Sequence, residues 1–231
     1  MFEKYPTICH LPGSTMSRDD KRLDEKDIDI LMNSSSLHVS EKVDGAIVGI
    51  KMQDNTPVLF KRSGVIGTGE HLQYQEFKSW VFANMDRVGQ IPESWAVYGE
   101  WLSIHHTIPY NKLPEFFLAF DIMTPDGFLS IEDRDKYLNE FGFSSPKAID
   151  ELSLDFFAYN EYTIYQLTKL LQSLSKHASE YNDSILEGFV IRNTYNDVPK
   201  EDWLKAKWVR NDFIQGEHWS KTNIIHNTLG E

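Results

Sequence analysis

The sequence has little cysteine, no long apolar segment and fewer basic than acidic residues. Cys9 is the single cysteine among 231 residues, so an internal disulfide and a zinc site built from several thiolates are both excluded. No apolar run approaches the roughly 18–20 residues of a membrane span. The first residues, Met-Phe-Glu-Lys-Tyr-Pro, also lack the apolar core of a secretory signal. We therefore expect a cytoplasmic protein that does not bind a membrane.

The charge of the chain is acidic, but it is unevenly distributed. There are 23 Lys and Arg residues against 35 Asp and Glu residues, a formal charge of −12. A surface that binds a phosphate backbone is normally basic, so the total argues against a nucleic-acid partner. However, residues 19–29 carry −3 and residues 121–161 carry −7, which leaves only −2 for the other 179 residues. We expect the two acidic segments to lie away from any bound strand.

The pattern of apolar residues predicts an α+β fold. Helical spacing is found in a short segment after residues 19–29, over 70–85, from Ser130 to Gly142 and after Thr163. Strand-like runs occur at 46–52, 57–62, 95–99, 116–122, 186–192 and 203–209. These elements do not alternate regularly, so we expect antiparallel sheets flanked by helices. No repeat or linker divides the sequence, which favours one domain over residues 1–231.

The usual phosphate-binding loops are missing, and a lysine-containing tetrad stands out instead. The chain has no G-x-x-x-x-G-K-[ST] sequence, and no G-x-G-x-x-G opens a helix. In Lys42-Val-Asp-Gly45, Lys42 and Asp44 would share one face of a strand, and the glycine would allow close approach of a ligand. A lysine becomes a nucleophile when burial and nearby cations keep it neutral. A surface salt bridge would explain this tetrad equally well.

A second lysine pair lies near the end of the predicted sheet. Lys205 and Lys207 stand two residues apart, so both ammonium groups point from one face of a strand whose other face is apolar. No carboxylate in this repeat neutralises them, and a bound phosphate would do so. The alternative is a solvated basic face on an edge strand.

Six short motifs follow one another in a characteristic order. They are Lys42-Val-Asp-Gly45, Arg62-Ser-Gly64, Tyr98-Gly-Glu-Trp101, Phe120-Asp-Ile-Met123, Glu187-Gly-Phe-Val-Ile191 and Lys205-Ala-Lys207. Together they resemble the ordered motifs of the covalent nucleotidyltransferases, which comprise ATP-dependent ligases and mRNA capping enzymes.

Further residues point to one branch of this family. DNA ligases and capping enzymes usually have an arginine where this chain has Ile47, so the resemblance favours the RNA ligases similar to phage nick-sealing and RNA-editing enzymes. Lys4-Tyr-Pro6, His10-Leu-Pro-Gly13 and His218-Trp-Ser220 also resemble small bacterial and viral RNA ligases.

The resemblance implies a fold, an activity and a set of site residues. The fold would be an adenylyltransferase domain without a C-terminal OB domain. The activity would be ATP-dependent joining of 3′-hydroxyl and 5′-phosphate ends through AMP carried on a lysine and then an adenylated 5′ end. By this resemblance Lys42, Lys205 and Lys207 are catalytic, Glu41, Asp44, Arg62, Glu100 and Phe120 contact the nucleotide, and Glu187 holds Mg²⁺ or Mn²⁺.

The expected partners are RNA ends or a nicked duplex that contains RNA. The protein would act as a monomer in RNA repair, in a bacterial or phage-infected cell. Three alternatives stay open: a DNA nick ligase, a capping-type guanylyltransferase that uses GTP, and a nucleotide-binding relative without catalysis. Phe120 could also be an ordinary core aromatic, and Glu100 a surface carboxylate.

Overall fold

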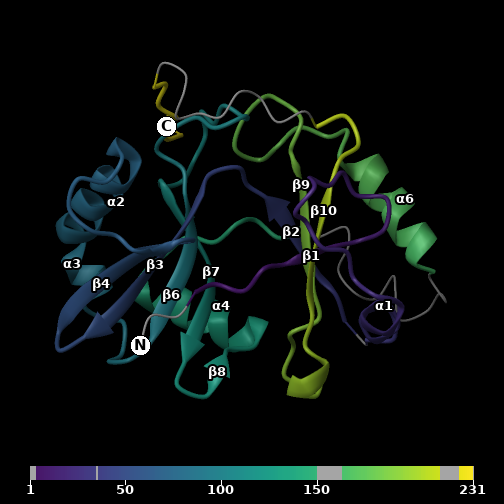
Figure 1. Cartoon of the computed structure of the whole chain (residues 1–231), viewed down its shortest axis with the longest axis horizontal. Helices are drawn as coiled ribbons and strands as arrows, with labels where there is room; N and C mark the ends of the chain where they lie inside the picture. The colour runs from purple at the N-terminus through teal and green to yellow at the C-terminus, as the bar shows by residue number, and fades with distance from the viewer. Residues whose placement is uncertain (1–3, 35, 150–162, 214–223, 231) are drawn as a thin grey trace. The chain divides into compact units, whose positions relative to one another are not determined.

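A computed structural model describes residues 4–34, 36–149, 163–213 and 224–230 (Figure 1). The predicted similarity at 218–220 lies outside these residues. The chain forms two compact units. The first comprises Met1–Pro6, Asp44–Ser145 and Glu217–Glu231, and the second comprises Thr7–Val43 and Pro146–Gly216. Among the described residues, no helix combines the length and apolar character needed to span a membrane. The single adenylyltransferase domain over residues 1–231 stays a prediction.

The first unit is built on a six-stranded sheet in which all paired neighbours are antiparallel. Its strand order is β5-β4-β3-β6-β7-β8. The strands are β3 (Ala46–Gln53), β4 (Thr56–Lys61), β5 (Gly64–Val65), β6 (Ala96–Trp101), β7 (Phe117–Thr124) and β8 (Gly127–Phe128). The predicted hairpin forms between β3 and β4, because Asp54 and Asn55 both adopt the positive φ that a tight hairpin turn requires.

Three helices cover one face of this sheet: α2 (Leu72–Ala83), α3 (Met85–Val88) and α4 (Ile131–Phe141). The predicted caps form, since Ser130 accepts a hydrogen bond from the N–H of Asp133 and Gly142 ends α4 with φ 75°. Apolar side chains of the helices pack with alternate residues of the strands. By the same alternation, Tyr98, Glu100 and Asp121 point from the opposite face.

The second unit contains a four-stranded sheet of order β1-β10-β9-β2. The strands are β1 (Cys9–His10), β2 (His38–Lys42), β9 (Gly188–Arg192) and β10 (Lys205–Val209), and a 3-10 turn, η2 (Lys200–Asp202), precedes β10. The β1–β10 pair is parallel, while the other pairs are antiparallel as predicted. Because β10 pairs with β1 as well as with β9, it is not an edge strand, and the alternative given for Lys205 and Lys207 does not apply in that respect.

Two helices, α1 (Glu25–Met32) and α6 (Ile164–Leu174), lie on one side of this sheet (Figure 1). The capping box predicted at Thr163 and Gln166 opens α6. Leucines of both helices pack against Phe189 and Trp208 of the sheet, so this side is the apolar core of the unit. The side chains that alternate with these core residues therefore point from the other face.

Candidate functional site

The three predicted catalytic lysines share one face of the second unit's sheet. Lys42 pairs in register with Gly188, Lys207 with Val190, and Lys205 with Arg192. Paired residues point to the same side of a sheet, so this face collects lysines from β2 and β10 on either side of β9. Arg192 adds a fourth cation that the sequence reasoning missed, although alternation from Gly188 along the strand would have indicated it.

Lys42 lies directly against Glu187. Its Nζ is 2.7 Å from Glu187 Oε2, and the two side chains are 25% and 6% exposed. The next residue, Gly188, lies where β9 passes very close to β10: a Cβ there would lie 2.0 Å from the carbonyl oxygen of Trp208. A glycine is therefore required for this approach. The structure thus brings together the predicted nucleophile and the predicted metal ligand.

A carboxylate of the protein itself forms an ion pair with Lys207. Its Nζ lies 3.0 Å from Oδ1 of Asp20, a residue that sequence analysis did not single out. Asp20 belongs to the acidic segment 19–29, so part of a segment expected to lie away from a bound strand contacts a predicted catalytic lysine. Burial opposes ionisation of Asp20, but hydrogen bonds from Ser17 and the charge of Lys207 outweigh it and hold its pKa well below the usual range. Sequence analysis expected a bound phosphate to balance the charge of Lys207. Asp20 supplies part of that negative charge from within the chain.

His10 is buried beside Asp20, and the charges of two of the lysines act on its ring. The side chain is 2% exposed, and its Nε2 lies 3.2 Å from Asp20 Oδ1. Burial lowers the pKa of His10, the charge of Lys207 lowers it further, and Lys42 contributes in the same direction against the opposing effect of Asp20. The sheet register places Lys42 and Lys207 on the same face, on either side of β9.

Glu41 occupies the opposite, core-facing side of β2. It is 3% exposed, Oε1 accepts a hydrogen bond from the Ser179 hydroxyl at 2.5 Å, and Oε2 accepts one from the N–H of Glu180 at 3.2 Å. Burial raises the pKa of Glu41 to about 7, against the lowering effect of these two hydrogen bonds. The Glu41 carboxyl therefore anchors the 179–180 segment, and it does not point with Lys42.

In the first unit, the carboxylates of Asp44 and Glu100 each accept hydrogen bonds from backbone N–H groups. Asp44 Oδ2 accepts hydrogen bonds from the N–H groups of Thr107 at 2.7 Å and Ile108 at 3.1 Å. The N–H of Gly45 donates to Glu100 Oε1 at 3.2 Å. A Cβ on Gly45 would lie 2.6 Å from the Trp101 carbonyl oxygen and from the Leu102 side chain. This motif glycine lets the chain approach β6 closely.

Phe120 sits on a β-bulge. The pairing of β6 with β7 passes from Tyr98–Asp121 to Gly99–Ala119, so Phe120 is the extra residue of the bulge. Bulges commonly redirect a side chain beside a functional site. The ring is half-buried, and it meets the ring of Tyr5 edge-on at 5.1 Å between centroids.

The chain around this bulge is fixed by polar contacts. Tyr5 donates a hydrogen bond to Asp121 Oδ2 at 2.5 Å, and both side chains are buried. Arg134 donates to the Phe120 carbonyl at 3.3 Å. Phe120 therefore differs from the neighbouring core residues of β7, since its ring is partly accessible while its backbone is held on both sides.

Arg62 is exposed in the turn between β4 and β5, and it makes no hydrogen bond or ion pair with another described residue. The preceding residue, Lys61, pairs with Glu70. The guanidinium of Arg62 is thus available to an anionic ligand.

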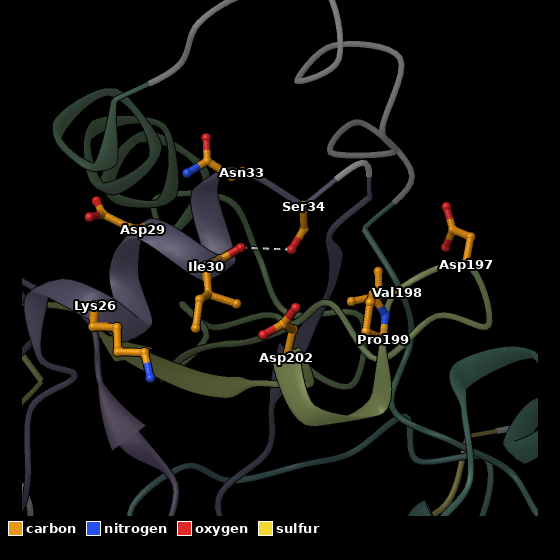
Figure 2. A pocket seen from close by; sticks show the side chains of 9 residues that line it. All are labelled: Lys26, Asp29, Ile30, Asn33, Ser34, Asp197, Val198, Pro199 and Asp202. Atoms are coloured by element: carbon orange, nitrogen blue, oxygen red, sulfur yellow. Dashed lines mark hydrogen bonds between the residues drawn. The ribbon is translucent and has the colours of Figure 1, made fainter.

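A separate pocket of about 430 Å³ lies in the second unit (Figure 2). Its lining residues come from α1 and the segment around η2: Lys26, Asp29, Ile30, Asn33, Ser34, Asp197, Val198, Pro199 and Asp202. Figure 2 shows the Ser34 hydroxyl donating a hydrogen bond, 2.9 Å long, to the carbonyl of Ile30. None of the predicted site residues lines this pocket.

Potential metal ligands are sparse in the part of the chain that the structure describes. Within it, no three His, Cys, Asp or Glu side chains form a group that could hold a metal ion. Magnesium, however, is often held by one or two carboxylates together with substrate phosphates and water. The Glu187 carboxylate beside Lys42 fits that mode of binding.

Comparison with known proteins identifies related sequences and folds. The sequence model of the RNA ligase family matches residues 35–207. The fold is similar to Naegleria gruberi RNA ligase with PPi, with a TM-score of 0.60 and 16% identity over 89% of this chain and 60% of that chain. A lysine-to-alanine variant of that ligase with ATP and Mn gives a TM-score of 0.59 and 17% identity, over the same shares of the two chains.

A glutamate-to-alanine variant with AMP and Mn gives a TM-score of 0.57 and 17% identity, over 90% of this chain and 62% of that chain. The chain therefore spans about 60% of the length of these solved structures. No curated protein sequence matches the chain. The structural similarity confirms the predicted α+β fold of the nucleotidyltransferase type.

Proposed function

Because this chain belongs to the RNA ligase family, we propose that it is an ATP-dependent RNA ligase that joins 3′-hydroxyl and 5′-phosphate ends. One observation carries the proposal: the segment that matches the family, residues 35–207, contains all nine predicted site residues. The geometry supports it, since Lys42, Lys205 and Lys207 share a sheet face and Lys42 contacts Glu187.

In the first step Lys42 would act as the nucleophile. Its neutral amine attacks the α-phosphorus of ATP, an N–P bond forms, and the bond to the β-phosphate breaks to release pyrophosphate. The positive charges of Lys205 and Lys207 on the same face favour the neutral amine and stabilise the negative charge on the transferring phosphate. Glu187 holds the Lys42 amine at hydrogen-bond distance before ATP binds.

In the later steps AMP moves to the RNA and is then displaced. An oxygen of the 5′-phosphate attacks the phosphorus of lysyl-AMP, and the N–P bond breaks. The 3′-hydroxyl then attacks the 5′-phosphate, forming the phosphodiester and releasing AMP. Phe120, with its accessible ring, would stack on adenine, while Arg62 and Glu100 would contact the phosphate or ribose, and Asp44 would hold the loop at Thr107.

A divalent ion, Mg²⁺ or Mn²⁺, would neutralise charge on the transferring phosphate when bound. Glu187 is the residue that fits this ion, as an oxygen ligand beside the nucleophile. The protein's own contribution is to place that carboxylate at the start of β9, where Gly188 allows the strands to lie close together.

The test is a sealing assay on nicked duplexes that differ only in the strand bearing the 3′-hydroxyl, which is RNA in one and DNA in the other. With ATP and Mg²⁺ we expect the RNA strand to be sealed preferentially, and Lys42→Ala to abolish sealing. Equal or better sealing of the all-DNA nick would favour a DNA ligase. Labelling of the protein by GTP instead of ATP would indicate a guanylyltransferase. The absence of both sealing and nucleotide labelling would indicate a non-catalytic relative.

A further inference from the structure

The segment between β1 and α1 is tied to β10 at several backbone positions. The N–H of Leu11 donates to the Lys207 carbonyl at 2.9 Å, and the N–H of Thr15 donates to the Val209 carbonyl at 3.0 Å. The segment then returns, because the N–H of Leu23 donates to the His10 carbonyl at 2.9 Å. Asp20 therefore lies in a loop whose two ends are fixed beside Lys207.

The orientation of the Asp20 carboxylate is fixed by donors on both of its oxygens. Oδ2 accepts hydrogen bonds from the backbone N–H of Ser17 at 2.8 Å and from the Ser17 hydroxyl at 2.7 Å. Oδ1 lies 3.0 Å from Lys207 Nζ and 3.2 Å from His10 Nε2. An ammonium on a flexible four-carbon side chain is thus held by a carboxylate that itself has little freedom.

The buried ring of His10 connects this carboxylate back to β10. Its Nδ1 lies 2.6 Å from Ser14 Oγ, and that oxygen accepts the N–H of Val209 at 2.9 Å. We assign the Ser14 hydroxyl as the donor to His10 Nδ1, because its other acceptor, the Thr15 carbonyl, is 3.4 Å away. This assignment leaves the imidazole proton on Nε2, which lies 3.2 Å from Asp20 Oδ1 without hydrogen-bond geometry, so the ring supports the carboxylate through charge and packing. The lowered pKa of His10 agrees with a neutral ring.

From this geometry we propose that Asp20, supported by His10, is a positioning residue that holds Lys207 in place for the reaction; the inference rests on the proposed function. An ammonium group has three N–H donors, and Asp20 accepts one of them. The other two can then meet phosphate oxygens at a fixed position. A charge that is already in place stabilises the transition state without the cost of ordering a long side chain during the reaction.

The test is the single-turnover rate of lysyl-AMP formation, measured with excess ATP and Mg²⁺ in the Asp20→Asn variant. We expect the rate constant to fall about tenfold, while the final amount of adduct per protein stays at the wild-type value. A merely structural role would lower the final amount, since fewer molecules would be folded, and would leave the rate constant unchanged. Asp19→Asn is the matched control, because Asp19 is exposed and has no polar partner among the described residues.

His10→Gln provides a second variant that keeps Asp20 and Lys207. We expect a smaller fall of about threefold, since only the support of the carboxylate is weakened. If Asp20→Asn and His10→Gln both keep the wild-type rate constant, or if Asp19→Asn shows an equally large fall, this inference is overturned. The proposed function would still stand in that case, because the wild type forms the adduct. If the wild-type protein forms no adduct, the proposed function fails, and the inference fails with it.

Discussion

Replacing Glu41 by glutamine should remove a defined part of the pH dependence of stability. The Glu41 carboxyl is buried, and its pKa is about 7 in place of the ordinary 4.5. Because the folded pKa lies above the unfolded one, this group stabilises the fold fully below about pH 4.5 and loses that contribution as the pH rises through about 7. The difference between the two pKa values corresponds to about 3 kcal/mol of unfolding free energy.

The glutamine amide can replace the protonated carboxyl at this position. Its NH₂ can donate to the Ser179 oxygen, and its carbonyl can accept the N–H of Glu180. We therefore expect Glu41→Gln to be close to the wild type in stability at about pH 5 and more stable by up to about 3 kcal/mol at about pH 8.

Urea unfolding followed by circular dichroism at several pH values measures this difference. Glu201→Gln is the control, because Glu201 is an exposed residue of the same unit without a hydrogen bond or ion pair to a described residue. A stability difference between Glu41→Gln and the wild type that does not change with pH would refute the reasoning.

Three further predictions concern the close contacts around the site. Gly188→Ala should destabilise the protein by about 3 kcal/mol or more in thermal unfolding, because the new Cβ would lie 2.0 Å from the Trp208 carbonyl oxygen. The control Gly67→Ala should have little effect, because a Cβ there has nothing within 4 Å, and equal effects of the two substitutions would contradict the prediction. Asp44→Ala should increase hydrogen exchange at the amides of Thr107 and Ile108, and unchanged protection would contradict their anchoring. Tyr5→Phe should cost about 1–3 kcal/mol in urea unfolding, since it leaves the buried Asp121 without this donor, and a neutral result would contradict that role.

Local sequence patterns predict much of this fold because their causes are local. The capping residues Ser130 and Thr163 begin helices where expected, and the Asp54–Asn55 turn joins two strands. Alternation along 205–209 also places Lys205 and Lys207 on one face, as the structure confirms.

The parts that sequence reasoning missed depend on contacts between distant segments. Asp20 lies 187 positions before Lys207, and it meets that lysine only because the two-residue strand β1 pairs in parallel with β10. A strand of that length has no period to detect. The bulge at Phe120 arises from the register of β6 against β7, which the packing of the sheet determines. The roles predicted for all nine site residues remain predictions.

The intact mass of the protein after incubation with ATP and Mg²⁺ tests the central claim, which is that Lys42 carries AMP. We predict a covalent AMP adduct on the wild type and on Lys78→Ala, where an exposed lysine of α2 is removed, and no adduct on Lys42→Ala. An unmodified wild-type protein, or an adduct that persists in Lys42→Ala, would contradict the account.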